Sequence, residues 1–81
     1  MQLRKKILLV EDDPNFGMVL KAFLEIKKFN VTLCNDGGEA FQIAKNQAFD
    51  FLILDVMLPN KDGFSIAKEL KENGIKTPFV F

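Results

Sequence analysis

Carboxylates follow two of the most apolar runs in this chain, and they are the residues whose types and spacing indicate chemistry. The run Lys6–Val10 leads into Glu11 and Asp12, and the run Phe51–Leu54 leads into Asp55. Short apolar runs of branched residues are typical of strands that are buried on both faces of a parallel sheet. Ligand sites in such sheets lie beyond the carboxyl ends of the strands.

Three of these acids define a candidate metal site. If the two strands lie side by side, Glu11, Asp12 and Asp55 meet in one small pocket. Three carboxylates at close range repel one another, and a hard divalent cation is the usual way to offset that repulsion. The sequence therefore predicts a divalent-metal site that contains an aspartate.

The elements that position these acids are predicted from the rest of the chain. Strands are expected over 5–10, 30–34, 50–54 and 78–81, and helices over 14–28, 39–47 and 64–73. Alternating strands and helices with short loops predict an α/β fold with a parallel sheet that helices cover on both faces. At 81 residues the chain is at most one small domain.

Helix ends and buried faces can also be predicted. Asp13 is expected to cap the first helix, Pro14 suits its first turn, and the turn at 35–38 can cap the second helix. Apolar spacing predicts inward-facing residues on the three helices, and the phenylalanines among them are interpreted as core residues. The predicted inward positions are Phe16, Val19, Leu20, Phe23 and Leu24, then Ala40, Phe41, Ala44 and Ala48, then Phe64, Ala67 and Leu70.

The composition excludes several classes of function. Eleven basic and eleven acidic residues cancel, which favours neither nucleic acid nor an anionic membrane as a partner. Cys34 is the only cysteine and there is no histidine. A disulfide framework, a Cys/His zinc site and a histidine-activated nucleophile are therefore excluded within one chain.

No apolar stretch approaches the roughly 18 residues that a membrane-spanning helix needs. The first apolar run, Ile7 to Val10, is also too short for a secretory signal. A reduced, cytoplasmic protein without membrane contact is expected, with Cys34 as a small buried side chain.

The chain ends in an apolar strand, Phe79-Val80-Phe81, with nothing after it. A strand at the edge of a sheet presents unpaired backbone groups, which favour pairing with another chain. We therefore expect either that the chain is a fragment or that it forms a homodimer through this exposed fourth strand.

Four segments together carry a specific likeness. They are KILLVEDD at 6–13, NDGGEA at 35–40, DFLILDVMLPNKDGF at 50–64 and KTPFVF at 76–81. In this order and spacing the chain resembles the receiver domain of bacterial two-component response regulators over essentially its whole length. The resemblance implies a flavodoxin-like three-layer αβα fold with strands one to four and helices one to three of the family's five and five. Residues 1–81 then correspond to the N-terminal two-thirds of a receiver domain, truncated after the fourth strand.

The resemblance also implies roles for individual residues. Asp55 stands where the family has its phosphoacceptor, and Glu11 and Asp12 stand where it has its metal-binding acidic pair. Mg²⁺ is the implied cofactor, with the backbone carbonyl of Met57 as a further ligand. An aspartate can attack phosphorus and form an acyl phosphate, and Mg²⁺ neutralises the charge that develops. The family's Ser or Thr and its Lys would lie beyond Phe81, so impaired switching is expected.

The implied partner is a sensor histidine kinase or a phosphotransfer protein, and the implied role is that of a signalling phosphoacceptor and not an enzyme. Direct contact with nucleic acid is not expected, although the triplet Met57-Leu58-Pro59 is most like receivers attached to a DNA-binding effector domain. Two alternatives stay open. One is an interaction module or self-associating folding fragment without phosphotransfer, and the other is a metal-dependent phosphatase.

Overall fold

The computed structural model describes residues 4–55 and 62–81. Strands and helices alternate along the chain as predicted. The elements are β1 (Lys6–Val10), α1 (Pro14–Ile26), β2 (Asn30–Cys34), α2 (Gly37–Asn46), β3 (Phe51–Leu54), α3 (Gly63–Glu72) and β4 (Phe79–Val80). No helix in these described ranges is both long enough and apolar enough to cross a membrane.

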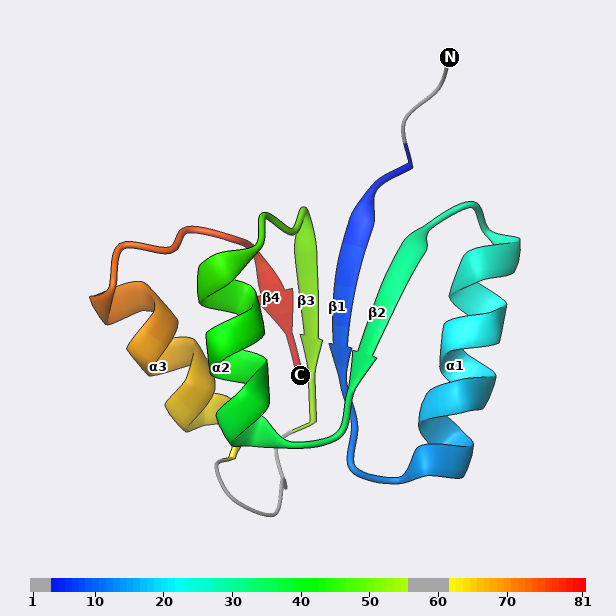
Figure 1. Ribbon diagram of the computed structural model, residues 1–81, viewed down its shortest axis with the longest axis horizontal. Helices are drawn as coiled ribbons and strands as arrows, with labels where there is room; N and C mark the ends of the chain where they lie inside the picture. Colours follow the sequence, from blue (N-terminus) through cyan, green and yellow to red (C-terminus); the bar gives the residue numbers. More distant parts are fainter. Residues whose placement is uncertain (1–3, 56–61) are drawn as a thin grey trace.

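The strands form one parallel sheet in the order β2-β1-β3-β4. One face of the sheet carries α2 and α3, and the other carries α1, which gives three layers (Figure 1). This arrangement confirms the predicted flavodoxin-like architecture. Because β1 pairs with both β2 and β3, it is an interior strand. Its carboxyl end therefore lies between the ends of two neighbouring strands.

The two faces of the sheet are buried unequally. Successive residues of a strand point to opposite faces, so Leu8 and Val10 face one way and Ile7 and Leu9 face the other. The core under α2 and α3 contains ten buried residues: Leu8, Val10, Cys34, Ala40, Ala44, Leu52, Leu54, Ile66, Ala67 and Leu70. The core under α1 contains only three, Ile7, Leu9 and Val31. The α1 face of the sheet is therefore the less completely covered one.

The predicted buried stripe of α1 is largely wrong. Phe16, Val19 and Phe23 are 54%, 68% and 52% exposed, and only Leu20 and Leu24 pack partly against the sheet. A single helix lying on a sheet buries a narrow line of side chains. The wider apolar stripe of α1 would need a second neighbour to bury it, and the described residues supply none on that side.

Two further predicted inward positions, Phe64 and Ala48, are also wrong, whereas Phe41 packs partly buried against the core as predicted. All nine phenylalanines lie in the described part of the chain, and none of them is among the fully buried residues. Phe64 and Ala48, which were expected to face inward, are exposed, while Ile66 takes the buried place on α3. Smaller aliphatic residues fill the core, and aromatic rings lie around its margin.

Some element boundaries differ from the prediction for identifiable reasons. α2 begins at Gly37 and not at residue 39, because the Asp36 carboxylate accepts a hydrogen bond from the Gly38 amide at 2.9 Å. α1 ends at Ile26, and Lys28 then adopts a left-handed conformation with φ of 74°. The Phe29 amide donates to the Leu24 carbonyl at 3.1 Å across this turn.

Replacing Lys28 by glycine should therefore stabilise the protein. The left-handed conformation costs an L-residue about 1 kcal/mol relative to glycine. We expect Lys28→Gly to raise the free energy of unfolding by about that amount in urea denaturation. Lys27→Gly is the matched control, because Lys27 has φ of −80° and gains nothing from glycine. Destabilisation by both substitutions would contradict the assignment of strain to Lys28.

Candidate functional site

The ladder of backbone hydrogen bonds continues past the strand ends and fixes the acids that follow. The Glu11 amide donates to the Cys34 carbonyl at 2.9 Å, and the Asp55 amide donates to the Val10 carbonyl at 2.9 Å. In the register of the sheet Val10 pairs with Leu54, so the residues after them are neighbours. The backbone therefore holds Glu11 and Asp55 at adjacent positions without help from their side chains.

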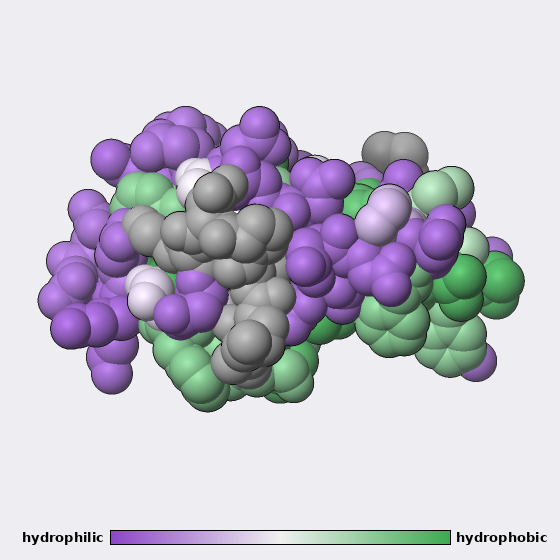
Figure 2. Space-filling view, turned by 90° about the horizontal axis from the view of Figure 1, so that it is seen from below, coloured by the Kyte–Doolittle hydropathy of each residue, from purple (hydrophilic) through white to green (hydrophobic). Residues whose placement is uncertain are grey.

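The structure brings together the three acids that the sequence singled out. Carboxylate oxygens of Glu11, Asp12 and Asp55 all lie within 4.8 Å of one another. Glu11 and Asp55 are half-buried and Asp12 is exposed. The end of the molecule that contains these strand ends is mostly hydrophilic (Figure 2). Asp12 is thus the most exposed acid of the cluster.

The pKa of the Glu11 carboxyl group is shifted by its position in the cluster. Partial burial raises the pKa of its carboxyl group above the ordinary glutamate value, and Asp55 and Asp12 beside it raise the pKa further. The Asp13 amide, which donates to the Glu11 carboxylate at 3.1 Å, lowers it in part. The net direction is upward, because this one amide does not offset the effects of burial and of the neighbouring carboxylates.

Other acids at the same edge have a different role. Asp13 accepts from the amides of Asn15 and Phe16 at 3.0 and 3.3 Å and caps α1, as predicted. Asp36 caps α2, and Asp62 caps α3 by accepting from the Ser65 amide at 2.8 Å. These three carboxylates are engaged with helix N-termini, which separates them from the cluster of Glu11, Asp12 and Asp55.

Two features that support the site, the backbone amide of Asp13 and the glycine at position 17, were not predicted from the sequence. Asp13 was interpreted only as a cap, yet its backbone amide also orients Glu11. Gly17 is buried in α1, and a Cβ atom there would meet Leu33 at 3.0 Å and the Glu11 side chain at 3.6 Å. A glycine inside a helix is unfavourable unless close packing requires it, so this one residue was a usable signal. A backbone amide has no comparable signal in the sequence.

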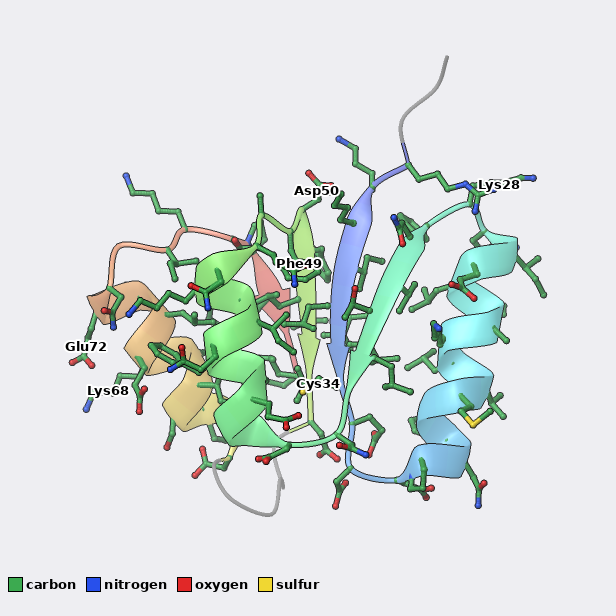
Figure 3. The ribbon with its side chains drawn as sticks, viewed as in Figure 1. Lys28, Cys34, Phe49, Asp50, Lys68 and Glu72 are labelled. Carbon is green, nitrogen blue, oxygen red and sulfur yellow. The ribbon has the colours of Figure 1, made fainter. Side chains whose placement is uncertain are left out.

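One expected ligand cannot be placed. Met57, whose carbonyl the family resemblance implies as a metal ligand, lies outside the described residues. Cys34 is described, and it is buried at the end of β2 (Figure 3). Its thiol donates to the Asp36 carbonyl at 3.2 Å, and burial raises its pKa. It is therefore a poor nucleophile and is turned away from the acidic cluster.

Three hollows among the described residues lie away from the cluster. One of about 470 Å³ is at the opposite end of the sheet, lined by residues 4–6 and 48–50. Asp50, labelled at that end in Figure 3, is held there by the Lys6 amide, which donates to its carboxylate at 2.7 Å. That hollow gathers no cluster of metal-ligating groups. A metal ion needs converging oxygens more than volume, and among the described residues Glu11, Asp12 and Asp55 provide such oxygens.

Comparison with known proteins gives consistent results. The family model for the response regulator receiver domain matches residues 7–81. The transcriptional regulatory protein RprY of Bacteroides fragilis is 37% identical over 81 residues, which are all of this chain and 34% of RprY. The chain thus spans about a third of the length of that relative.

Solved structures agree. A response regulator receiver domain from Francisella superposes with a TM-score of 0.91 at 30% identity, covering 94% of this chain and 63% of that one. The receiver domain of a sensor histidine kinase from Pseudomonas aeruginosa, described with a magnesium ion coordinated in its active site cleft, gives 0.88 at 38% identity. That match covers 95% of this chain and 65% of the other.

The raised pKa of Glu11 predicts how stability depends on pH in the absence of metal. The folded state binds this proton more tightly than the unfolded state, so the free energy of unfolding should fall as pH rises from about 4.5 through the folded pKa. Glu11→Gln removes the titrating group and should flatten this decline. The measurement is urea denaturation in EDTA at several pH values from about 4 to 7.

Glu39→Gln serves as the matched control, because it removes an exposed carboxylate from the first turn of α2, outside the cluster. This control should keep the decline of the parent protein. A decline that is equally steep in the Glu11→Gln variant would show that the crowding of carboxylates around Glu11 has no energetic consequence.

Proposed function

The chain belongs to the response regulator receiver domain family, and from that premise we propose that Asp55 accepts a phosphoryl group with Mg²⁺ held by Glu11, Asp12 and Asp55. As a receiver domain of two-component response regulators it is a signalling module and not a classical enzyme. The observation that carries the proposal is the convergence of three carboxylates within 4.8 Å at the ends of β1 and β3.

The chemistry of the donor set fits magnesium. All the ligand atoms in the cluster are carboxylate oxygens, which are the donors that this hard cation prefers. The nearby sulfur of Cys34 points to the Asp36 carbonyl and does not compete. The magnesium described in the active site cleft of the Pseudomonas aeruginosa receiver domain, at 38% identity, further supports the choice of metal.

The three acids have different proposed roles in metal binding and phosphoryl transfer. Asp12 and Asp55 would bind the ion directly and Glu11 would hold one of its waters, while the Met57 carbonyl stays a predicted further ligand. When bound, Mg²⁺ neutralises negative charge on the phosphoryl oxygens. An Asp55 carboxylate oxygen attacks the phosphorus and forms the P–O bond of an acyl phosphate. The bond from phosphorus to the donor breaks, and the donor atom keeps its electron pair.

The backbone of this chain positions the nucleophile. The hydrogen bond from the Asp55 amide to Val10 ties the acceptor to the central strand, so the carboxylate is held before the donor arrives. The half-burial of Asp55 leaves one side open to the incoming phosphoryl group. Self-phosphorylation from a small acyl phosphate is part of this proposal.

The partners follow from the family and remain proposals. A sensor histidine kinase or a phosphotransfer protein would supply the phosphoryl group in the cytoplasm. RprY is named as a transcriptional regulatory protein and is about three times the length of this chain, which supports a DNA-binding effector domain in the parent protein. With eleven basic and eleven acidic residues, this chain has no net charge to favour nucleic acid itself.

A homodimer through β4 also stays a proposal, as does the alternative of an interaction module without phosphotransfer. β4 lies at an edge of the sheet, and Phe79, Val80 and Phe81 are 39%, 46% and 51% exposed. An exposed apolar edge strand favours association with another chain. Partner binding that ignores both Mg²⁺ and Asp55 would favour the interaction module.

Phosphorylation can be tested by intact mass after incubation with acetyl phosphate and Mg²⁺. We expect one added phosphoryl group on the parent chain, and none on Asp55→Asn, because an amide is not a nucleophile toward phosphorus. Removal of the metal with EDTA should reduce labelling of the parent chain to background.

The matched control is Asp62→Asn, which changes a carboxylate at the same edge. Asn caps helices as well as Asp does, so this variant should keep α3 and should be labelled like the parent. Equal labelling of Asp55→Asn and the parent would overturn the assignment of the acceptor.

A further inference from the structure

A glycine occupies a buried position inside α1. Of the thirteen residues of this helix, Gly17 is the one that the described part of the chain buries. Its backbone is helical and its φ is not positive, so any L-residue could adopt the same conformation. Glycine weakens a helix interior relative to alanine, because it loses more backbone entropy on folding. The advantage of glycine at this position must therefore lie in the space that a side chain would fill.

That space is already occupied by two side chains from other parts of the fold. A Cβ atom on Gly17 would lie 3.0 and 3.3 Å from the two Cδ atoms of Leu33, which is closer than such atoms normally approach. It would lie 3.6 Å from Cγ of Glu11, an ordinary van der Waals distance. The backbone of α1 thus packs directly on Leu33 of β2 and beside the stem of Glu11. A larger residue at position 17 requires either the helix or Leu33 to move.

This contact lies beside the candidate metal site. The first turns of α1 are at the same end of the molecule as the carboxyl ends of β1 and β2 (Figure 1). Leu33 precedes Cys34, whose carbonyl accepts a hydrogen bond from the Glu11 amide at 2.9 Å. The contact of α1 with β2 and the start of the acidic segment therefore share one strand end.

Local hydrogen bonds connect Gly17 to the acids. The Gly17 amide donates to the Asp13 carbonyl at 2.8 Å, and the Asp13 amide donates to the Glu11 carboxylate at 3.1 Å. The Asp13 carboxylate also accepts from the amides of Asn15 and Phe16, at 3.0 and 3.3 Å. Each of these bonds joins residues that are close in sequence, which leaves little slack between them. A displacement of the first turn of α1 is therefore transmitted to Asp13 and to the Glu11 carboxylate.

We propose that Gly17 is a positioning residue for the magnesium site. Because it lets α1 lie directly on β2, it holds residues 11–13 at the place where the carboxylates of Glu11 and Asp12 converge with Asp55. Gly17 does not contact the ion and acts through Asp13 and Glu11. The inference deepens the proposed function and rests on it, since the ion is the Mg²⁺ assigned to these acids.

The opposite side of the site does not depend on α1. The Asp55 amide donates to the Val10 carbonyl, so the sheet alone fixes the backbone of the proposed acceptor. Asp12, in contrast, lies between the end of β1 at Val10 and the start of α1 at Pro14. A shift of α1 therefore changes the distance from Asp12 to Asp55 while the strands stay in register. Mg²⁺ demands near-ideal coordination geometry, so such a shift weakens its binding.

Metal affinity and stability should respond differently to a substitution at Gly17. Alanine is favoured over glycine inside a helix, and this gain offsets part of the cost of the close contact with Leu33. The metal site gains nothing from helix propensity and experiences only the displacement. Gly17→Ala should therefore lose metal affinity while it stays folded.

The first test compares the Mg²⁺ affinity of the parent chain and of Gly17→Ala, by titration followed through backbone amide resonances. We expect the dissociation constant to rise roughly 10-fold, the lower end of the loss seen when groups that orient metal ligands are removed. Gly38→Ala is the matched control, because a Cβ atom there meets Asp36 Oδ1 at an ordinary 3.6 Å and α2 contributes no member of the cluster. Its affinity should equal that of the parent.

A second variant separates positioning from general destabilisation. Leu33→Val removes both Cδ atoms that a Cβ atom at position 17 would meet. In the Gly17→Ala background it should restore the Mg²⁺ affinity to within about twofold of the parent, because the two substitutions are coupled through one contact. If Gly17→Ala acted only by loosening the fold, truncation of a partly buried leucine would weaken binding again.

The Asp13 amide gives a readout that needs no metal. In EDTA its resonance should shift in Gly17→Ala and return in the double variant, because this amide donates to the Glu11 carboxylate and lies next to the displaced turn. A parent chain that binds no Mg²⁺ would refute the proposed function, and the Asp13 resonance would then still decide whether Gly17 positions residues 11–13.

Equal Mg²⁺ affinity of the parent and Gly17→Ala would overturn the role of Gly17 and leave the proposed function standing. A loss of affinity that Leu33→Val does not relieve would overturn that role as well. The same holds for a loss that far-UV circular dichroism traces to unfolding of the variant, because Gly17 would then serve stability alone.

Discussion

The parallel pairing of β1 with strands on both sides is the constraint on which the rest of the structure depends. Ile7, Leu8, Leu9 and Val10 are all at most 4% exposed, because the strand is covered on both faces and flanked on both edges. The same ladder continues through the amides of Glu11 and Asp55. The apolar core thus sets the positions of the acids, and the carboxylates do not have to hold themselves together.

The site that results is unfavourable without a cation. Burial raises the pKa of Glu11, and the neighbouring carboxylates of Asp55 and Asp12 raise it further, because the folded chain holds their negative charges close together. A domain this small has a limited core to offset such repulsion. The proposed function uses that repulsion, since a bound cation and an incoming phosphoryl group interact most strongly with charge that is already concentrated.

Much of the fold and of the site could be predicted from the sequence, because the signals were local. Alternating apolar runs indicated the strands, Asp13 indicated a helix start, and acids after two strands indicated the cluster. The prediction that Phe16, Val19, Phe23 and Phe64 are buried was wrong, because all four are exposed. Helical spacing shows that residues share a side of a helix, but burial depends on which elements lie opposite, and that information is not local. The strained backbone of Lys28 had no signal in its residue type either.

We propose that Glu11, Asp12 and Asp55 act as one magnesium site, created by the ends of β1 and β3. The most direct measurement is a titration of the chain with Mg²⁺ followed by the backbone amide resonances in NMR. We expect saturable shifts concentrated at residues 10–13 and 54–55, with none of comparable size at Asp36 or at Asp50. Shifts spread evenly over all the acidic residues, or no saturation, would contradict it.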